Sequence, residues 1–316
     1  MLKLAIVGAG VMGANHARVA RAVPGLEIAY VVDPDLARAE RAAASSGAQA
    51  TTDLGDVLGR VDCAIVASPS SFHEEHGLAL IGRGTHVLVE KPVAVSVEAG
   101  RRLVDAAADA GVVLQVGHVE RFNPAVLELD RLAGDVVHME TARIGPYSSR
   151  VEVGVVLDLM IHDLDIVLSL SGAEPVDVHA TARCTRSSTE DLVSALVTFD
   201  NGVSASLTAS RIGQTKIRTL ALTREKDYVA VDLLRQDVTI HRVDHSEYLS
   251  DEGTRYRQTG VVELPFLENR GEPLYLELSH FAQTVREGGQ PRVSGRDGLR
   301  ALDLAMRVRA AAGLGE

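Results

Sequence analysis

A glycine-rich turn near the N-terminus constrains the fold of this chain more than any other stretch. The apolar run Leu2-Lys-Leu-Ala-Ile-Val7 leads directly into Gly8-Ala-Gly10-Val11-Met12-Gly13, and a helical segment at 14–23 follows and ends at Pro24-Gly25. Between a strand and a helix, the first glycine turns the chain, the second lets a pyrophosphate approach the backbone, and the third lets the helix pack on the strand. The pattern therefore predicts a dinucleotide site, although a structural glycine turn would look the same in isolation.

An acidic residue at the end of the next apolar segment supports this prediction. The segment Leu26–Val32 is expected to form the second strand, and it ends at Asp33, twenty residues after Gly13. A carboxylate at this place binds the ribose hydroxyls of the adenosine and repels the 2′-phosphate of NADP. We therefore expect NAD as the cofactor, with NADP disfavoured, although Arg38 on the following helix could moderate that preference.

Strands and helices alternate through the following part of the chain. Apolar runs at 61–67, 86–89 and 112–116 indicate further strands, and helices are expected between them at 34–46, 71–83 and 96–111. Such alternation, with right-handed crossovers, predicts an α/β fold of the Rossmann type, a doubly wound parallel sheet.

Polar groups follow three of these strands at their carboxyl ends, which in a parallel sheet face one crevice. They are Ser68-Pro69-Ser-Ser-Phe-His73, then Glu90-Lys91-Pro92, and finally Gly117-His118 with Glu120-Arg121. Because the proline fixes the turn, Lys91 is presented in one direction, and its charge could place a substrate hydroxyl. A capped helix or a solvated loop would account for the same residues, so their roles stay open at this point.

The stretch from Gly154 to Leu168 combines an apolar pattern with candidate chemistry. Read at helical period, Asp158, His162 and Asp165 lie on one face. The opposite face is apolar, with Leu157, Met160, Ile161, Leu164 and Leu168. An imidazole titrates near neutrality, as a general base must, but an ordinary solvated helix also carries a carboxylate and an imidazole one turn apart.

The periodicity changes after Pro124, where apolar and polar residues alternate as in half-buried strands. Strands are expected at 136–144, 176–184, 192–199, 203–211, 216–223 and 228–233, with a hairpin turn at Asp200-Asn201-Gly202. We therefore expect an α+β domain with a large, mostly antiparallel open sheet and the Asp158 helix on one face. Its other face carries small polar side chains: Ser194, Thr198, Ser204, Ser206, Thr208 and Ser210. The charged stretch 235–259 is expected to be an edge hairpin and loop, and 274–285 and 299–311 are expected to be helices.

Composition excludes several classes of partner. The 316 residues carry a formal charge of −11 and no tryptophan, which disfavours binding to nucleic acid or to an anionic membrane. No apolar run reaches the length of a membrane span, and the chain begins directly with a strand pattern, so a cytoplasmic location is expected. Neither cysteine, Cys63 or Cys184, has a partner at metal-ligand spacing, so no metal is expected.

With these parts in order, the chain resembles the Gfo/Idh/MocA family of nicotinamide-dependent oxidoreductases along essentially its whole length. The resemblance rests on the glycine turn, on Glu90-Lys91-Pro92, and on Asp158-x-x-x-His162-x-x-Asp165, in which Met160 stands where the family's D-x-G-x-H-x-x-D pattern has glycine. It implies an NAD-binding domain at 1–121, a substrate-binding and oligomerisation domain at 122–272, and C-terminal helices at 273–316 that return towards the first domain. It also implies a homodimer or homotetramer formed through the sheet of the second domain.

The resemblance further implies roles for single residues. Lys91, Asp158 and His162 would form the catalytic group, Asp165 would support the helix, and His73 would lie near the cofactor's diphosphate and ribose. The full set expected at the cofactor is Gly8, Gly10, Val11, Met12, Gly13, Asp33, Ser68, Pro69, His73, Glu90 and Lys91.

The stretches 117–124 and 153–158 are most similar to the branch of the family that oxidises nucleotide sugars. Arg121, Asn123, Tyr147 and Arg150 would then contact the substrate together with the catalytic group, since arginine recognises phosphate oxygens bidentately. A salt-bridged loop would explain the same residues.

The expected activity is NAD-dependent oxidation of a secondary hydroxyl of a sugar, at C3 of a UDP-linked 2-acetamido sugar. His162 would act as base, Asp158 would orient the sugar or the imidazole, and Lys91 would stabilise the developing alkoxide. Two alternatives stay open: a dehydrogenase or reductase of a free polyol or aldose such as inositol, and a non-catalytic NAD-linked sugar-binding protein. A methyltransferase-like use of the glycine turn would leave Asp33 and Lys91 unexplained.

Overall fold

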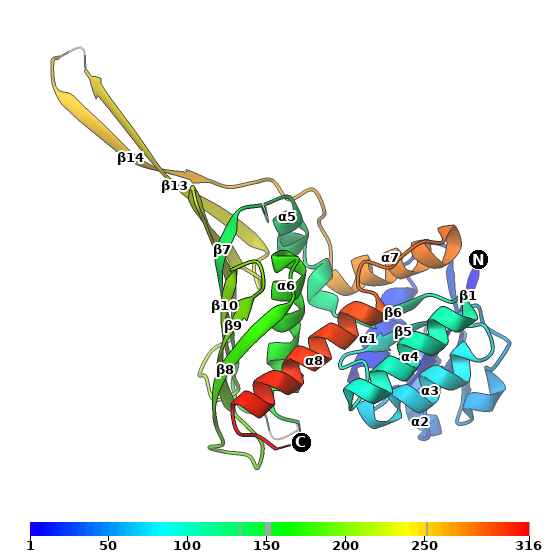
Figure 1. Cartoon of the computed structure of the whole chain (residues 1–316). Coiled ribbons are helices and arrows are strands. Elements are labelled where there is room, and N and C mark those ends of the chain that lie inside the picture. The colour runs from blue at the N-terminus through cyan, green and yellow to red at the C-terminus, as the bar shows by residue number, and fades with distance from the viewer. Residues whose placement is uncertain (133, 149–152, 251, 316) are drawn as a thin grey trace. The chain divides into compact units, whose positions relative to one another are not determined.

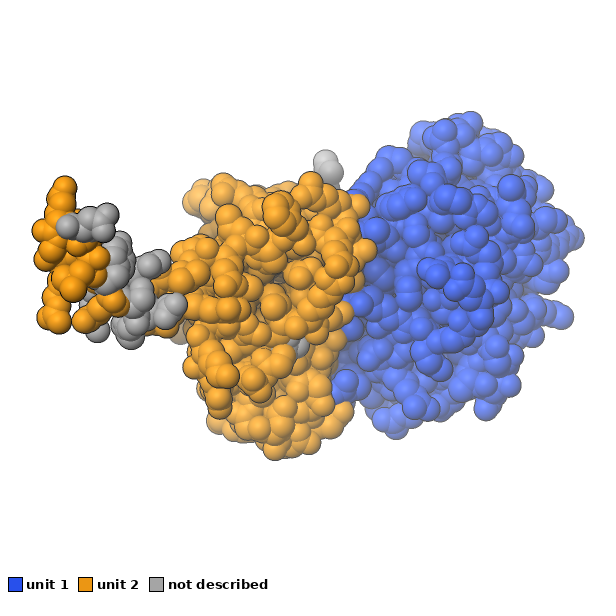
Figure 2. Space-filling view, turned by 90° about the horizontal axis from the view of Figure 1, so that it is seen from above, with its two compact units in different colours: residues 1–122, 271–303 blue, residues 123–270, 304–316 orange. Residues whose placement is uncertain are grey.

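The computed structural model describes residues 1–132, 134–148, 153–250 and 252–315, and the chain divides into two compact units (Figure 2). Unit 1 consists of Met1–Phe122 and Gly271–Asp303, and unit 2 of Asn123–Arg270 and Leu304–Glu316. The C-terminal helices are therefore divided between the units, because α8 (Gly295–Ala311) contributes its first part to unit 1 and its last turns to unit 2.

Unit 1 is built on a six-stranded sheet in which every neighbouring pair is parallel, in the order β3-β2-β1-β4-β5-β6. The strands are β1 (Leu2–Val7), β2 (Leu26–Val32), β3 (Gln49–Thr51), β4 (Cys63–Val66), β5 (His86–Glu90) and β6 (Leu114–Gly117). The order reverses between β1 and β4, which is the switch point where doubly wound sheets bind ligands. The prediction of a Rossmann-type parallel sheet is confirmed, and β3 is a short strand that the sequence pattern missed.

Helices and short 3-10 turns connect these strands (Figure 1). The helices are α1 (Val11–Ala20), α2 (Leu36–Ala43), α3 (His73–Ile81), α4 (Val97–Ala110) and α7 (Pro273–Glu287), and the 3-10 turns are η1 (Leu54–Asp56), η2 (Ser70–Phe72) and η3 (Val119–Phe122). The ends follow ordinary capping chemistry: the side chain of Ser96 accepts from the Ala99 amide at the start of α4, and Gly111 ends that helix in the left-handed region.

The core of unit 1 joins its sheet to a helix from the far end of the sequence. Leu4 and Ile6 of β1 are fully buried, and Leu278 and Phe281 of α7 belong to the same apolar cluster as the inner residues of α1 and α2. The helix expected at 274–285 is thus present as α7. Burial of these large side chains makes α7 an integral part of the dinucleotide-binding fold.

Unit 2 contains an eight-stranded sheet in the order β14-β13-β12-β11-β7-β10-β9-β8. The strands are β7 (Val136–Ile144), β8 (Pro175–Arg183), β9 (Leu192–Phe199), β10 (Ser204–Ser210), β11 (Ile217–Arg224), β12 (Asp227–Asp232), β13 (Asp237–Leu249) and β14 (Arg255–Glu263). All pairs are antiparallel except β7 with β10, so the expected mostly antiparallel sheet is confirmed. Gly202, with φ of +86°, makes the predicted hairpin turn between β9 and β10.

One face of this sheet is covered by α5 (Pro124–Leu132) and α6 (Ile161–Ser171), as Figure 1 shows. Val193, Ala195, Val197 and Phe199 of β9 point into this covered face and are buried, while Ser194 and Thr198 between them are partly exposed. The alternation expected for half-buried strands is therefore present, and the small polar side chains lie on the outer face.

The last two strands extend past the others as a two-stranded arm (Figure 1). The sequence pattern indicated an edge hairpin with irregular loop at 235–259, but regular pairing runs from Ile240 with Glu263 to Leu249 with Arg255, interrupted by one register shift. Val243, Leu249 and Tyr256 are exposed on this arm. The predicted edge hairpin is thus confirmed, and its two strands are longer and more regularly paired than expected.

The mid-chain helix differs from its expected form. It begins with a π-helical turn, η4 (Val156–Met160), in which the Ile161 amide donates to the Val156 carbonyl, and α6 follows. Asp158 and His162 are partly exposed, but Asp163 and Asp165 are each only 2% exposed, so the helix is buried on nearly all sides. The simple division into an apolar and a polar face is thus wrong for Asp165.

A buried ion pair accounts for one of these acids. Nε of Arg143 on β7 lies 3.1 and 3.0 Å from the two carboxylate oxygens of Asp163, and Nη2 lies 2.8 Å from Oδ1. Both side chains are almost completely buried. This pair fixes α6 to the central strand of the sheet, and removing one partner would leave a buried charge without its counter-ion.

Replacing Asp163 by alanine is expected to lower the free energy of unfolding by about 3–5 kcal/mol, because the Arg143 guanidinium would stay buried without its carboxylate. Urea unfolding followed by circular dichroism measures the loss. The matched control is Glu268→Ala, which removes an exposed ion pair with Arg131 and should leave the unfolding midpoint unchanged. Equal midpoints for the Asp163 variant and the wild type would contradict the assigned role.

Candidate functional site

The glycine turn after β1 leaves room for a ligand at one position only. A Cβ atom at Gly8, whose φ is +97°, would lie 2.6 Å from the Ala67 carbonyl oxygen, and one at Gly13 would lie 1.8 Å from the Gly8 carbonyl oxygen. Neither position has space for a side chain. At Gly10, by contrast, a Cβ would meet no atom within 4 Å, so the backbone there is open to an approaching group.

The start of α1 has the properties of an anion site. Gly10 is its N-cap and supplies no side-chain hydrogen bond, so no side chain caps the amides of the first turn. Val11 is 81% exposed although it is apolar, and Met12 is partly exposed. Aligned amides at a helix start attract a diphosphate, and a bound dinucleotide would cover the exposed Val11. These residues fit NAD.

Asp33 closes the same turn from the end of β2. It is 5% exposed; its Oδ2 accepts from the Ala9 amide at 2.7 Å and its Oδ1 from the Asp35 amide at 2.9 Å. Each carboxylate oxygen keeps a second lone pair that can accept from a ribose hydroxyl. Arg38 lies 3.3 Å from the Asp35 carboxylate, so its charge is partly compensated within α2.

His73 joins the loops that follow β4 and β5. Its Nε2 lies 2.9 Å from the Ser68 carbonyl oxygen and its Nδ1 lies 2.9 Å from the Pro92 carbonyl oxygen. Burial lowers the pKa of His73, although the two carbonyls act against this shift. Ser68 Oγ in turn lies 3.1 Å from Nδ1 of His76, and Pro69 is exposed before η2. His73 is therefore held between the backbone carbonyl groups of Ser68 and Pro92, one in each loop.

Glu90 holds the Lys91 loop through its buried carboxylate. It is 7% exposed; its Oε1 lies 2.7 Å from Nε2 of His16 on α1, and its Oε2 accepts from the Lys91 amide at 3.2 Å. Burial opposes ionisation of this carboxyl, but His16 and Lys91 outweigh it and hold the pKa of Glu90 below its ordinary value. The carboxylate thus connects the dinucleotide-binding helix to Lys91, which is partly exposed beside the cis-linked Pro92.

Two of the expected substrate contacts have structural roles. Asn123 is 2% exposed; its Nδ2 donates to the Leu233 carbonyl at 2.9 Å, and its Oδ1 accepts from the Ala125 amide at 3.1 Å at the start of α5. Arg121 is 8% exposed in η3, and its carbonyl accepts from Nε of Arg292 at 3.0 Å. Their predicted contacts with substrate stay predictions.

In unit 2, Asp158 lines a cavity of about 280 Å³ together with several cationic side chains. The charged and aromatic residues around this cavity are Arg143, Tyr147, Asp158, Arg211, Lys216 and Arg218. Arg143 and Arg218 are register partners on β7 and β11 and point towards the helix-covered face. Arg211 follows β10, and its Nη2 donates to the Val153 carbonyl. The lining contains four cationic side chains and one carboxylate, that of Asp158, and a lining of this composition suits an anionic ligand.

The structure brings some predicted residues together and leaves others apart. Asp158 and Tyr147 share the cavity, and His162 lies one turn beyond Asp158 on α6. The Arg186 guanidinium lies 5.7 Å from the centre of the Tyr147 ring. Arg150 lies outside the described residues. Lys91 belongs to unit 1, where Glu90 connects it to the helix that follows the glycine turn.

Sequence reasoning missed the cations of the cavity. Arg143 follows the inward Met139 and Thr141 on β7, and Arg218 precedes the inward Leu220 and Leu222 on β11. A charge at such a position was the available signal. Lys216 and Arg211 lie at strand ends, where periodicity gives no information. Within the described part of the chain, no three His, Cys, Asp or Glu side chains are grouped as metal ligands. None of its helices is long and apolar enough to cross a bilayer.

Comparison with known proteins identifies the architecture. Residues 2–118 match the family model described as "Oxidoreductase family, NAD-binding Rossmann fold", and residues 129–226 match the GFO/IDH/MocA C-terminal domain. The UDP-N-acetylglucosamine 3-dehydrogenase of Acidithiobacillus ferrooxidans is 30% identical over 98% of this chain and 97% of its own length. The scyllo-inositol 2-dehydrogenase (NAD(+)) of Bacillus subtilis is 28% identical over 96% of this chain and 92% of its own.

Solved structures agree with the sequence matches. The structure of the UDP-N-acetylglucosamine 3-dehydrogenase from Acidithiobacillus ferrooxidans superposes with a TM-score of 0.89, at 30% identity, and covers 99% of this chain and 98% of that one. A levoglucosan dehydrogenase in complex with NADH and levoglucosan shares the fold with a TM-score of 0.84 at 20% identity, covering 99% and 97% of the two chains. The expectations of an NAD-binding fold and of an oxidoreductase are thereby confirmed. The chain belongs to the Gfo/Idh/MocA family of NAD-binding oxidoreductases.

Proposed function

We propose that this oxidoreductase oxidises a secondary hydroxyl of a nucleotide sugar, at C3 of a UDP-linked 2-acetamido sugar. The observation that carries the proposal is the placement of Asp158 in a cavity whose lining includes Arg211, Lys216 and Arg218. A free polyol has no charge for these side chains to bind, whereas a diphosphate accepts hydrogen bonds from several cations at once. A nucleotide sugar therefore uses both halves of the cavity lining, the carboxylate for the sugar and the cations for the diphosphate.

The relatives support this choice. The relative that matches this chain over almost its full length at 30% identity is named for oxidation of UDP-N-acetylglucosamine at C3. The inositol dehydrogenases among the relatives favour the alternative, a free polyol as substrate. The cationic lining of the cavity supports the nucleotide sugar as the substrate.

The proposed mechanism assigns one task to each of three side chains. When bound, NAD supplies the acceptor for the hydride that leaves the carbinol carbon. His162 takes the proton of the reacting hydroxyl, because an imidazole can accept it near neutral pH. Asp158, which precedes it by one turn, orients the sugar or the imidazole. Lys91, presented by the loop that Glu90 and His73 hold, stabilises the charge that develops on the oxygen.

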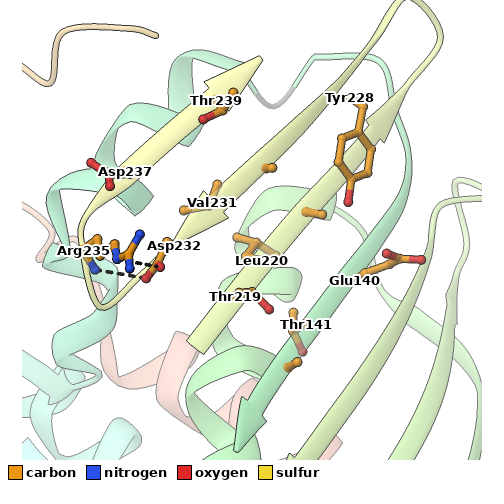
Figure 3. A pocket seen from close by; sticks show the side chains of 13 residues that line it. Glu140, Thr141, Thr219, Leu220, Tyr228, Val231, Asp232, Arg235, Asp237 and Thr239 are labelled. Carbon is orange, nitrogen blue, oxygen red and sulfur yellow. Dashed lines mark hydrogen bonds and ion pairs between the residues drawn. The ribbon is translucent and has the colours of Figure 1, made fainter. Parts of the chain in front are cut away.

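We also propose that the protein forms a homodimer or homotetramer through the outer face of the sheet in unit 2. No helix among the described residues of this unit covers that face (Figure 1), and it contains a hollow of about 650 Å³ over β7, β11, β12 and β13 (Figure 3). Ala142, Thr219, Ala221 and Ala230 make its floor flat and small-chained. In a two-fold dimer the same patch of both copies meets, so an uncovered sheet face with small side chains can pair with a second copy of the chain.

Removing either of the two side chains proposed to act on the reacting hydroxyl should stop the reaction. His162→Ala and Lys91→Ala are expected to lower kcat by roughly 10²–10⁴-fold, because each removes a group that acts on the reacting hydroxyl. NAD affinity, measured by fluorescence titration, should be retained in the His162 variant. The controls are His179→Ala and Lys226→Ala, which change exposed residues of unit 2. Wild-type turnover in both active-site variants would refute the catalytic assignment.

The cations of the cavity should discriminate between charged and free sugars. Arg218→Gln and Lys216→Gln are each expected to lower kcat/KM for UDP-N-acetylglucosamine by about 10–100-fold, since a hydrogen bond to a charged group contributes about 1.5–3 kcal/mol. Steady-state assays with free N-acetylglucosamine should show no such loss, and Arg183→Gln on β8 is the matched control. A wild-type preference for inositol over UDP-sugars would instead favour the polyol alternative.

The oligomer should depend on the small residues of the outer face. Ala221 pairs with Glu140 across β7 and β11, so Ala221→Glu would place two carboxylates side by side and is expected to shift the assembly towards monomer. Sedimentation velocity measures the shift. Ala110→Glu makes the same change at an exposed helix end in unit 1 and should leave the assembly intact. An unchanged sedimentation coefficient for the Ala221 variant would exclude this face as the interface.

A further inference from the structure

A buried carboxyl group with no hydrogen-bond partner lies in unit 1, outside the residues considered so far. Glu277, in the first half of α7, is 0% exposed, and neither of its carboxylate oxygens has a hydrogen-bond partner among the described residues. A buried carboxylate normally has a cation or several donors around it, because an isolated charge in the interior is very unfavourable. Glu277 lies instead on the buried side of α7, among apolar residues such as Leu274, Leu278 and Phe281.

Its surroundings connect it to the Lys91 loop. Helix α7 contacts α1, which carries His16, and Glu90 on β5 is close enough to act electrostatically on Glu277. Nδ1 of His16 is buried and, like Glu277, has no hydrogen-bond partner in the described part of the chain, while Nε2 binds Glu90. Glu277 is therefore coupled to Glu90, and Glu90 also binds His16 and the Lys91 amide.

The two carboxyl groups cannot both be ionised at low cost. Burial raises the pKa of Glu277 well above its usual range, and the negative charge of Glu90 raises it further. The pKa of Glu90 is shifted the other way by His16 and Lys91. When two carboxyls share an interior site, one proton stays with the group that has fewer donors. Here that group is Glu277.

Other charged groups around α7 do not change this assignment. Arg18 on α1 is exposed and pairs with Glu272, and η3 contributes Glu120 and Arg121, both buried. His280 on the same helix accepts from the Arg292 amide at 2.8 Å, and burial followed by the charge of Arg292 lowers the pKa of His280. Among all these, Glu90 is the group that acts together with burial on Glu277.

We propose that Glu277 is a positioning residue that holds a proton and thereby keeps a single negative charge, that of Glu90, under the Lys91 loop. With that one charge, Glu90 binds His16 on one side and the Lys91 amide on the other. Ionisation of Glu277 would add a second negative charge near Glu90. Repulsion between the two carboxylates would then disturb the contacts of Glu90 with His16 and with the Lys91 amide. The expected effect on turnover rests on the proposed catalytic role of Lys91. The protonation of Glu277 does not depend on that role.

The sign of the pH effect follows from the raised pKa. Between the ordinary pKa of a glutamic acid and that of Glu277 in the folded chain, the folded protein binds a proton that the unfolded chain releases. Unfolding is therefore favoured as the pH rises through this window. Glu277→Gln is neutral at every pH and of the same shape, so it removes this dependence. Its unfolding free energy should exceed that of the wild type by an amount that grows from about pH 5 upwards.

The test compares full-length wild type, Glu277→Gln and the control Glu287→Gln, an exposed change at the end of the same helix. Infrared spectroscopy should show the carbonyl band of a protonated carboxylic acid in the wild type near neutral pH, and this band should be absent in Glu277→Gln alone. Urea unfolding from about pH 5 to pH 9 should show the growing stability difference. At about pH 7 the Glu277 variant should turn over within about twofold of the wild type, and its alkaline loss of kcat should move to higher pH.

Glu277→Met serves as a second variant of similar length, should the glutamine leave its own amide unsatisfied. Identical infrared bands in wild type and Glu277→Gln, or parallel stability curves across the pH range, would overturn the proposal. These two measurements need no substrate. Failure of the catalytic assignment, seen as wild-type turnover in Lys91→Ala, is thus distinguished from failure of the protonation assignment.

Discussion

The hydrogen bond between His16 and Glu90 is the contact on which the first unit depends. At 2.7 Å, and fully removed from solvent on the histidine side, it joins the helix that starts at the glycine turn to the end of β5. Charge-assisted bonds of this kind are short and strong when buried. Because the other oxygen of Glu90 holds the Lys91 amide, the cofactor helix and the lysine loop are fixed by one carboxylate. Glu90, the first residue of the Glu-Lys-Pro motif, thus has a structural role in addition to being part of the motif.

The second unit is also held by a buried charge, but there the charge on the central strand is positive. Its central strand inserts the Arg143 guanidinium into the interior, and Asp163 of α6 compensates it. The π-helical turn at 156–160 then lets Asp158 face a cavity while the residues of α6 remain in the core. A π turn inside a helix is frequent at functional sites because it re-aims a side chain without ending the helix. Met160, which replaces the family's glycine, is fully buried in this turn.

Periodicity and spacing predicted the parts of this fold whose local pattern agrees with their environment. The parallel strands, the glycine turn and the hairpin at Gly202 all have such local signals. The charged stretch after residue 235 indicated the hairpin of β13 and β14 but not its length or its regular pairing. The burial of Asp165 depends on contacts distant in sequence, so it could not be predicted. For the site, the motif residues were identifiable, but the cations around Asp158 and the acid at Glu277 come together only when distant strands and helices pack.

Substrate choice in this architecture can be separated from catalysis. Lys91 directly follows a parallel strand, and Asp158 and His162 lie at the start of a largely buried helix. By contrast, Lys216 is exposed directly before β11, and Arg218 is the second residue of that strand. Substitution there would alter the charge of the cavity without changing the proposed catalytic side chains. Within one fold, a change of charge at a strand end is thus a physical route to a different substrate.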